Sequence, residues 1–516
     1  MKLRRMKFLV VVSAILALVM SSVAGAQISY EKSTFTSYQV VNLGENDTTV
    51  TASYYDNTGT VVRSVDLPVG GDGGVATVLL ALDNELGAGQ FSATLSASEP
   101  LAAVVNQQLG DGGSNVSTAP FSSYTAVTGG ATSVTVPVIM HNWFGYHTQL
   151  YIQNVSGSDT ANVTITYRPT TFDGCLAGST GQSETVPGGL NSLASKSVSQ
   201  LNNTGLGLSG APSGCEGFNG RFLGSAEVTS DVEIAVVANQ YVQDKLFTYN
   251  GFTSVEAGTD LILPAYLRNW FNYYASLTIA NPGAAPANVT VNYNPDPNDP
   301  FVTPSAPISA NHTIPAGESI TIYDGPTGGS DISSAYPYGT NSRFFGSVGV
   351  TSNVPVVAMI NQEATGASGN QAGTYNSMTA SSGSQTISVP LIQSDFYGYY
   401  TSLTIASVDG TNPQVRITYT SDSEFSSNQG FTKSYVHTLS SGFLNRYEGA
   451  GVEAARSDIL SDAAWESGGT RRFIGSALIE VVSGSDVVAF VNSESNTAPN
   501  AATRDSMYTF NAFNLD

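Results

Sequence analysis

The stretch Asn288-Val289-Thr290-Val291-Asn292-Tyr293 alternates polar and apolar side chains with a period of two. This alternation is typical of a β-strand with one buried face, because successive side chains point to opposite sides of a sheet. The same pattern occurs at residues 162–167 and 414–419. Clusters of Gly, Asn, Pro and Ser separate such stretches, and only residues 451–465 favour a short helix. The sequence therefore predicts an all-β fold.

A longer repeat surrounds these strands. An apolar segment with a central proline precedes an aromatic cluster in three places, and its prolines stand at positions 137, 264 and 390. A block of the form Arg-Phe-x-Gly-Ser follows in each copy, at residues 221–225, 343–347 and 472–476. Each copy then closes on an aromatic residue followed by Asn, at residues 249–250, 375–376 and 510–511. Because order and spacing are kept, we expect one domain of about 125 residues to be repeated.

The N-terminal region carries a divergent copy. Residues 90–106 match the second block without its arginine, but the proline-containing strand and the aromatic cluster are missing at the front. We therefore expect four tandem β-sandwich domains, immunoglobulin-like or related, arranged as a rod. Their predicted bounds are 27–132 for the front-truncated repeat 1, 133–259 for repeat 2 with a stapled insert, 260–384 for repeat 3 and 385–516 for repeat 4.

The first 26 residues have the composition of a signal peptide. A basic start containing Lys2, Arg4, Arg5 and Lys7 precedes an apolar run over residues 8–20, and Ala24-Gly25-Ala26 predicts cleavage before Gln27. The apolar run is shorter than the roughly 20 residues that a membrane span needs. We expect the mature chain to be secreted or associated with the cell surface, without membrane insertion.

Charge and cysteine content limit the class of protein further. The chain has 19 Lys and Arg against 40 Asp and Glu, a net charge of -21. That balance opposes nucleic-acid binding, which needs clustered cations. The two cysteines, Cys175 and Cys215, predict one disulfide in an exported chain, with a metal pair as the weaker alternative.

The repeated aromatic clusters are the candidate binding residues. Exposed rings could stack on sugar faces or anchor a protein interface, whereas buried rings would pack under a domain end or against the neighbouring domain. The sequence leaves both interpretations open. The residues are Trp143, Phe144, Tyr146, Trp270, Phe271, Tyr273, Tyr274, Phe396, Tyr397, Tyr399 and Tyr400. The equivalent arginines Arg221, Arg343 and Arg472 favour a repeated structural contact, an ion pair or backbone clamp, over a ligand site.

Catalytic and metal motifs are absent from the sequence. His141 and His147 flank one aromatic cluster, but the equivalent positions in the other repeats carry no histidine. The oxygen-rich loops 296–299 and 71–73 lack the ligand spacing of a calcium loop and are expected to be turns, so calcium is a weak alternative to no cofactor. We expect a protein that is not an enzyme, and an extracellular hydrolase is the least favoured function.

The repeat style resembles the tandem immunoglobulin-like or related β-sandwich modules of secreted bacterial surface proteins. This resemblance implies a coat, stalk, filament or adhesin component, and the alternative is a carbohydrate-binding protein that uses the aromatic clusters. Expected partners are other surface proteins, further copies of the chain, or glycans. The missing front strand of repeat 1 adds one hypothesis: its open edge accepts a strand, either from residues 27–33 or from another subunit.

Overall fold

The computed structural model describes residues 33–71, 73–80, 83–110, 120–172, 174–242, 245–299, 306–325, 331–336, 343–364, 371–396, 398–422, 426, 428–449, 454–467, 469–495 and 507–515. The described chain is all-β, as the alternating stretches predict. The expected signal peptide and the segment 27–32 lie outside the described residues. None of the described helices is long and apolar enough to cross a membrane.

Repeat 1 contains two sheets, with strand orders β4-β1-β6-β7 and β3-β2-β5. Among the described strands, β5 pairs with β2 alone, at the edge where the proline-containing strand lies in the other repeats. Ser33 belongs to β1, not to a separate front strand. The strands are β1 (Ser33–Asn42), β2 (Thr48–Tyr55), β3 (Val61–Val69), β4 (Val75–Leu79), β5 (Ser92–Ser96), β6 (Leu101–Gly110) and β7 (Phe121–Thr125).

Repeats 2 and 3 use one long strand each to join two sheets. The first half of the long strand pairs with the proline-containing strand, and its second half pairs with the strand after the aromatic cluster. In repeat 2 the elements are β8 (Ala131–His141), β9 (His147–Asn154), β10 (Val163–Pro169), β11 (Thr171–Phe172), β12 (Cys175–Leu176), β13 (Ser183–Thr185), β14 (Ser195–Ser199), η3 (Thr204–Leu206), η4 (Glu216–Phe218), β15 (Phe222–Val242) and β16 (Lys245–Asn250). In repeat 3 they are β17 (Gly258–Trp270), β18 (Tyr273–Ala280), β19 (Ala287–Pro295), β20 (Ile308–Ile314), β21 (Ser319–Tyr323), β22 (Phe344–Ala364), β23 (Ala372–Asn376), β24 (Met378–Thr379) and η6 (Ala380–Ser382).

Repeat 4 again has two sheets, ordered β28-β27-β30-β25-β33 and β29-β26-β31-β32, in a sandwich-like arrangement. The short helix expected around residues 451–465 is divided, over the described residues 454–465, into one short α-helix between two 3-10 helices. The elements are β25 (Thr386–Ser394), β26 (Tyr399–Ser407), β27 (Gln414–Ser421), β28 (Thr432–Thr438), β29 (Phe443–Tyr447), η7 (Ala454–Arg456), α2 (Asp458–Ser461), η8 (Ala463–Trp465), β30 (Phe473–Ser483), β31 (Val487–Ser495), β32 (Tyr508–Asn511) and β33 (Phe513–Asn514).

The two repeated sequence blocks face each other across one strand pair. The proline-containing strand bulges at Pro137, Pro264 and Pro390, opposite the Ser of the Arg-Phe-x-Gly-Ser block, while the Gly is paired with the residue two positions after the proline. A proline is tolerated at a bulge because the bulge does not need its missing N–H. In repeat 2 the Tyr249 hydroxyl accepts from the Val138 N–H at 3.2 Å and donates to the Val138 carbonyl at 2.8 Å. Tyr375 makes the same pair of bonds with Ala265.

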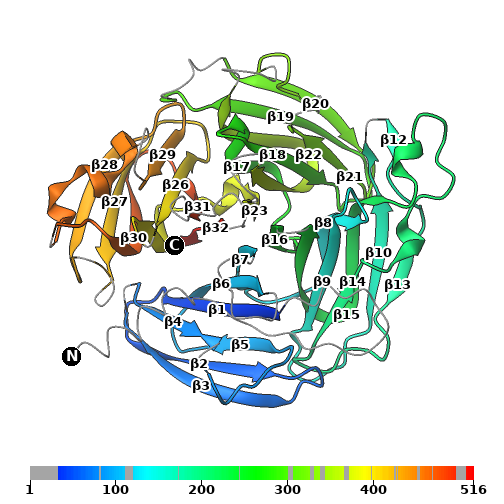
Figure 1. The fold of residues 1–516 in the computed structure, drawn as a ribbon, viewed down its shortest axis with the longest axis horizontal. Helices are drawn as coiled ribbons and strands as arrows, with labels where there is room; N and C mark the ends of the chain where they lie inside the picture. The colour runs from blue at the N-terminus through cyan, green and yellow to red at the C-terminus, as the bar shows by residue number, and fades with distance from the viewer. Residues whose placement is uncertain are drawn as a thin grey trace.

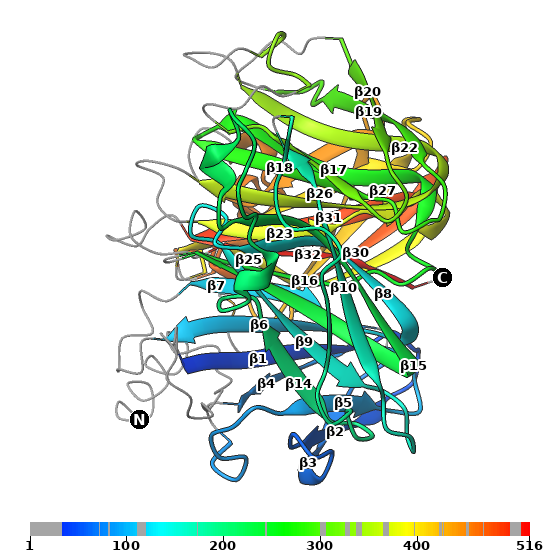
Figure 2. The ribbon, with the colours of Figure 1, turned by 90° about the vertical axis from the view of Figure 1, so that its right-hand side faces the viewer.

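The four repeats close into a ring, so the expected rod is wrong (Figure 1). One strand of each repeat lies near the centre, where β7 contacts β16 and β32, and β23 contacts the same two strands. In the perpendicular view these inner strands lie between repeat 1 and repeat 3 (Figure 2). The repeats form a ring and not a rod because the inner strand of each repeat has polar groups and apolar surface that contact the neighbouring repeats.

Hydrogen bonds between equivalent residues hold the centre of the ring. The Asn250 side chain donates to the Thr125 carbonyl at 2.7 Å, Asn376 donates to Asn250 at 2.9 Å, and Asn511 donates to Asn376 at 2.9 Å. Between repeats 4 and 1, the Ser123 hydroxyl donates to the Thr509 carbonyl at 2.8 Å and completes the circle. Apolar packing crosses the junctions as well, since the buried cores of repeats 2, 3 and 4 each continue into the following repeat.

Candidate functional site

Each aromatic cluster forms a tight hairpin turn. In repeat 2, Trp143 and Tyr146 exchange backbone hydrogen bonds of 3.1 and 2.9 Å. The two central residues, Phe144 and Gly145, have φ angles of 48° and 91°. In repeat 3 the central pair also has positive φ angles. Two positive φ values define the type I′ turn that matches the twist of paired strands, so the cluster fixes its aromatic side chains to one rigid corner.

The side chains of a cluster divide between burial and exposure. Trp143, Trp270 and Phe396 are 7%, 8% and 4% exposed and pack into the protein. The central residues Phe144 and Phe271 are 61% and 37% exposed. The tryptophans therefore do not form an exposed flat platform for a sugar ring, and their burial follows the packing interpretation. Tyr397 lies outside the described residues.

The repeated arginines lie on the exposed phenylalanines. The Arg221 guanidinium carbon is 3.9 Å from the centre of the Phe144 ring, and that of Arg343 is 4.5 Å from the centre of the Phe271 ring. The sequence predicts a repeated structural contact for these arginines, an ion pair or backbone clamp, and the structure shows a cation–π contact between the two repeated blocks in repeats 2 and 3. Arg472 precedes β30 and is exposed.

The tyrosine after the turn reaches into the next repeat. The Tyr146 hydroxyl donates to Glu363 at 2.8 Å, and the Tyr273 hydroxyl donates to Glu494 at 2.6 Å. The following tyrosines stay within their own repeats, where Tyr274 donates to Asn269 and Tyr400 donates to Asp395. The Tyr399 ring lies 6.5 Å from the Tyr508 ring. The aromatic clusters therefore place a hydroxyl at the junctions of repeats 2 and 3 and of repeats 3 and 4.

A cavity of about 240 Å³ lies at the junction of repeats 3 and 4. One wall comes from repeat 3 and is mostly apolar. The other wall is one face of neighbouring strands β29, β26 and β31, whose cross-strand partners place their side chains in rows. The lining residues are Ala265, Leu267, Trp270, Phe271, Tyr273, Phe345 and Gln362 from repeat 3, and Ser402, Thr404, Asn445, Tyr447, Phe490, Asn492 and Glu494 from repeat 4.

Two amide side chains in this cavity have unused hydrogen-bonding capacity. The Gln362 Oε1 and Asn492 Oδ1 atoms are buried and have no partner among the described residues. At the two preceding junctions the equivalent residues bond to each other: Asn239 donates to Gln107 at 2.9 Å and Asn361 donates to Gln240 at 2.8 Å. The third junction lacks this bridge. The equivalent Asn239 and Asn361 Oδ1 atoms are also buried without a partner, so the Gln362 Oε1 atom is what distinguishes the third junction. Because buried polar atoms normally have partners, Gln362 Oε1 is an acceptor available to a polar ligand.

Glu494 provides the charge of the cavity. Its carboxylate accepts from the Tyr273 hydroxyl at 2.6 Å and from the Tyr447 hydroxyl at 3.4 Å. Burial raises the pKa of Glu494, while the two tyrosine hydrogen bonds act in the opposite direction. Among the described residues, no Lys, Arg or His forms an ion pair with it. The cavity thus combines aromatic rings, free amide oxygens and one carboxylate.

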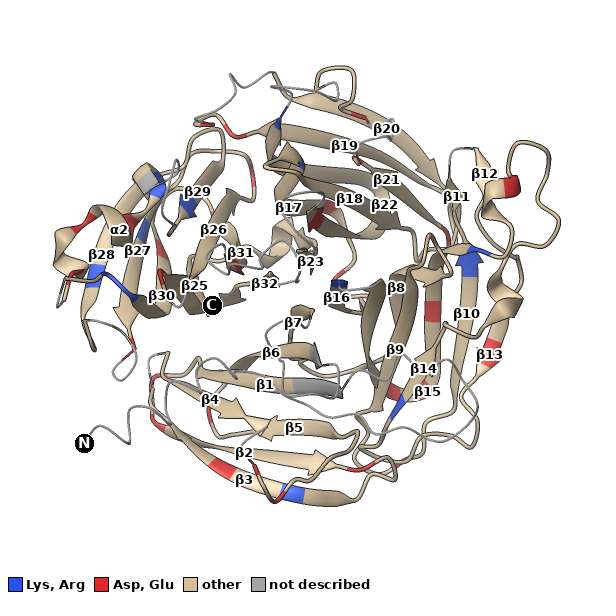
Figure 3. Ribbon diagram, in the orientation of Figure 1, with Lys and Arg blue, Asp and Glu red and all other residues tan. Residues whose placement is uncertain are grey.

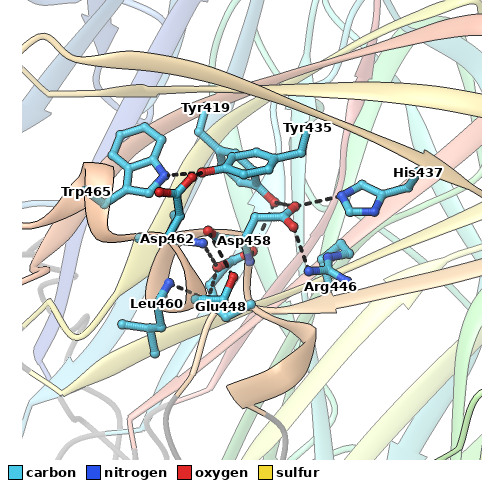
Figure 4. A network of polar contacts seen from close by, with 12 residues as sticks. Tyr419, Tyr435, His437, Arg446, Glu448, Asp458, Leu460, Asp462 and Trp465 are labelled. Carbon is cyan, nitrogen blue, oxygen red and sulfur yellow. Dashed lines mark hydrogen bonds and ion pairs between the residues drawn. The ribbon is translucent and has the colours of Figure 1, made fainter.

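A second polar cluster lies inside repeat 4 (Figure 4). The Tyr419 hydroxyl donates to Glu448 at 3.0 Å and to Asp458 at 3.3 Å. Asp458 also contacts His437 at 2.9 Å and Arg446 at 2.6 Å. Burial raises the pKa of Glu448, and neighbouring Asp458 raises it further. None of these residues lines the cavity at the junction, and their polar groups mostly bond to one another, so the cluster stabilises repeat 4 internally.

Repeat 3 has a related network. Buried Asp324 accepts from the Tyr266 hydroxyl and pairs with Arg268, while Asp331 contacts His312 at 3.0 Å. Burial raises the pKa of Asp324 to about 6. In repeat 2 the buried Gln200 takes the place of the acid and donates to the Tyr167 hydroxyl at 2.6 Å. An uncharged residue at this position fits a structural role.

The remaining sequence candidates occupy structural positions. His141 contacts the Gln200 carbonyl at 2.6 Å, and burial with neighbouring His141 lowers the pKa of His147 to about 4. Cys175 and Cys215 form the predicted disulfide. Asp296, from one of the oxygen-rich loops, pairs with Arg456 at 2.7 Å. The described residues contain no cluster of metal-ligating side chains, and Figure 3 shows the Lys and Arg residues scattered around the ring.

Sequence reasoning identified Trp270, Phe271 and Tyr273 but missed the residues of repeat 4 that complete the cavity. Glu494 and Asn492 stand two residues apart near the end of β31. One available signal was the acid at equivalent positions, Glu363 and Glu494, two residues after the Asn that ends an apolar segment. The face of the strand that carries them is buried by the neighbouring repeat, and this contact depends on ring closure.

No family model matches this chain, and no curated protein matches it. Among solved structures, the chain is similar to the crystal structure of Thermotoga maritima 1070, with 19% sequence identity. That match covers 23% of this chain and 92% of the other chain, with a TM-score of 0.18.

Proposed function

We propose that this chain is an exported, non-enzymatic interaction protein of the cell exterior that binds a carbohydrate at the junction of repeats 3 and 4. In this proposal four tandem immunoglobulin-like β-sandwich modules form the ring. The composition of residues 1–26 and the disulfide support export, because disulfides persist in oxidising compartments.

The cavity at the junction is the observation that carries the proposal. Its aromatic wall suits the apolar face of a sugar ring, and the unpartnered oxygens of Gln362 and Asn492 suit hydroxyl donors. About 240 Å³ is below the roughly 300–1,000 Å³ of pockets for drug-sized ligands, so the ligand is about one sugar ring in size. Glu494 is the only carboxylate among the lining residues, whereas most glycosidases need two. Binding without hydrolysis is therefore the function that the site supports.

A glycan-binding screen on residues 27–516, followed by calorimetry with the best monosaccharide, tests the proposal. Asn492→Ala should weaken binding by about tenfold, since it removes one hydrogen-bonding side chain. Trp143→Phe in repeat 2 is the matched control and should leave the affinity unchanged. The absence of binding to any glycan, or equal affinity in the Asn492→Ala variant, would count against the site.

A second function, a structural coat, stalk, filament or adhesin component, is favoured by one observation. Among the described strands, β5 has a paired neighbour on one edge only, and Ser92 of β5 contacts the Leu193 carbonyl of repeat 2 at 2.6 Å. A strand from another molecule could extend this sheet. Native sizing of culture fractions tests it: high-mass species would support assembly, and a clean monomer would oppose it.

A further inference from the structure

At the junction of repeats 2 and 3, the ammonium group of Lys245 pairs with the carboxylate of Glu363. The Lys245 Nζ atom lies 2.8 Å from Glu363 Oε2 and 3.1 Å from the Ala364 carbonyl oxygen. The Tyr146 hydroxyl donates to the same carboxylate oxygen at 2.8 Å, and the Tyr323 hydroxyl lies 3.5 Å from the other. The partly buried Glu363 carboxylate therefore has three partners at this junction, two tyrosine hydroxyls and one ammonium, and the ammonium also donates to a backbone carbonyl.

The junction of repeats 3 and 4 repeats every part of this set except the ammonium. Tyr273 and Tyr447 take the places of Tyr146 and Tyr323, and Glu494 takes the place of Glu363. Residues 245–250 and 371–376 both end in Thr-Tyr-Asn, and this alignment puts Gln371 where Lys245 stands. The Gln371 amide donates to the Ser495 carbonyl at 3.2 Å, which replaces the bond from Lys245 to Ala364.

Among the described residues, the Glu494 carboxylate therefore has no cationic partner, and it lies beside the cavity. A buried carboxylate is disfavoured unless a cation or several hydrogen bonds compensate it. At Glu494 the compensation comes from two hydroxyls, and the adjoining space is lined by Trp270 and both tyrosines. Aromatic faces attract ammonium groups, and the attraction is larger where water is excluded. The cavity is thus suited to a ligand that brings its own ammonium.

We infer that the cavity binds an amino sugar, with its primary ammonium on Glu494 and its hydroxyls on Gln362 and Asn492. The inference rests on the proposed function, since it specifies the class of carbohydrate that the same site takes. The ligand's ammonium would contact Glu494 in the way that the Lys245 ammonium contacts Glu363.

Calorimetric titration of residues 27–516 at about pH 6, where a sugar amine is protonated, tests the inference. The probes are glucosamine, galactosamine and mannosamine, each compared with its neutral parent hexose and its N-acetyl form. We expect at least one hexosamine to bind roughly tenfold or more tightly than its parent and its N-acetyl form, because only the free amine supplies the ion pair.

Two variants locate the effect. Glu494→Gln keeps the size of the side chain and removes its charge, so the preference for the amine should fall to about the level of the neutral sugar. Gln371→Lys should place an internal ammonium on Glu494, as Lys245 does on Glu363, and should abolish hexosamine binding. Glu480→Gln removes one carboxylate at the surface of β30 and should change nothing, which controls for net charge.

The outcomes separate the two proposals. If no sugar of any series binds and the wider glycan screen is also negative, the proposed function and the inference both fail. If a neutral hexose binds as tightly as its amine, and Gln371→Lys abolishes both, the carbohydrate site stands and the inference is overturned. If hexosamine binding survives in both Glu494→Gln and Gln371→Lys, the ammonium is held elsewhere and the inference is overturned.

Discussion

The guanidinium of Arg221 lies 3.9 Å above the ring of Phe144, a residue that remains 61% exposed. The two residues come from different repeated blocks, and Arg343 and Phe271 repeat the relationship. The arginine covers an apolar ring at the tip of a strained hairpin, since Phe144 has a φ of 48°. The contact thus links the start of the long strand to the corner of the aromatic cluster.

Replacing Arg221 with Ala should destabilise repeat 2 by about 1 kcal/mol, the upper value for cation–π contacts at exposed sites. A double-mutant cycle with Phe144→Ala, measured by urea unfolding, should give a coupling energy of about 0.5–1 kcal/mol. Additive effects of the two substitutions would show that the contact contributes nothing of its own.

The glycine of the Arg-Phe-x-Gly-Ser block should not tolerate a side chain. A Cβ atom on Gly346 would lie 2.0 Å from the Asn294 carbonyl oxygen, and one on Gly224 would lie 2.0 Å from that of Arg168. Gly346→Ala should therefore cost at least about 3 kcal/mol or prevent folding. Gly349→Ala, on the same strand, is the matched control, because a Cβ there meets nothing within 4 Å. Equal melting temperatures for the two variants would refute the steric argument.

Removing the Tyr375 hydroxyl should lower the free energy of unfolding by more than the small change in buried area accounts for. It accepts from the Ala265 N–H at 3.0 Å and donates to the Ala265 carbonyl at 2.7 Å. That carbonyl also accepts from Gln362 Nε2 at 2.9 Å, so removal of the hydroxyl leaves the buried Ala265 N–H unpaired. Tyr375→Phe should reduce the free energy of unfolding by about 1–3 kcal/mol. Tyr274→Phe, which loses one bond to Asn269, should cost less in the same chemical-denaturation assay.

Asp324 should give repeat 3 a measurable pH dependence. Burial raises its pKa from 3.8 to about 6, so the folded state holds this proton more tightly than the unfolded chain. Its stabilising effect is complete below about pH 4 and is lost as the pH rises through about 6. Asp324→Asn should remove a change of up to about 3 kcal/mol across that window.

Urea unfolding of both proteins between about pH 4 and pH 7 measures this difference. The variant also weakens the pairing of Arg268, so its absolute stability falls at every pH. The informative quantity is the gap between the two proteins. A gap that stays constant with pH would show that Asp324 does not titrate in this range.

Reduction of the Cys175–Cys215 disulfide should loosen the packing around the Trp143 side chain. Phe218 stands three residues after Cys215, and its ring stacks on Trp143 with 5.2 Å between ring centres. Phe172 stands three residues before Cys175, and its ring centre lies 5.4 Å from that of Trp143. Reduction should release about 3–4 kcal/mol of stabilisation on the chain-entropy model and shift the Trp143 emission to longer wavelength. The shift should vanish in a Trp143→Phe variant, while Trp270 and Trp465 still emit. An unchanged spectrum after reduction would mean that the insert keeps its packing without the bond.

The sequence predicts the strands well because their periodicity is local. The alternating stretches 162–167, 288–293 and 414–419 form β10, β19 and β27, and the cysteine pair forms the expected disulfide. The ring and the ligand cavity depend on contacts between repeats. Asn376 bonds to Asn250 across 126 positions of sequence, and nothing in the pattern around either residue specifies the angle at which neighbouring repeats meet. The rod interpretation was wrong for this reason.

The same limit applies to the candidate site. Tyr273 stands out in sequence because its cluster is repeated, but its partner Glu494 is 221 residues away. The difference between Lys245 and Gln371 becomes informative only when both are seen to lie at a junction.

A ring made of four separate, identical chains would carry four identical junctions, and any substitution would alter all of them together. Encoding the ring as one chain removes that constraint. The junction of repeats 2 and 3 contains Lys245, which pairs with Glu363, whereas the junction of repeats 3 and 4 has Gln371 at the equivalent position and contains a cavity. The covalent links thus let each junction carry its own side chains, so that a substitution at one junction leaves the others unchanged.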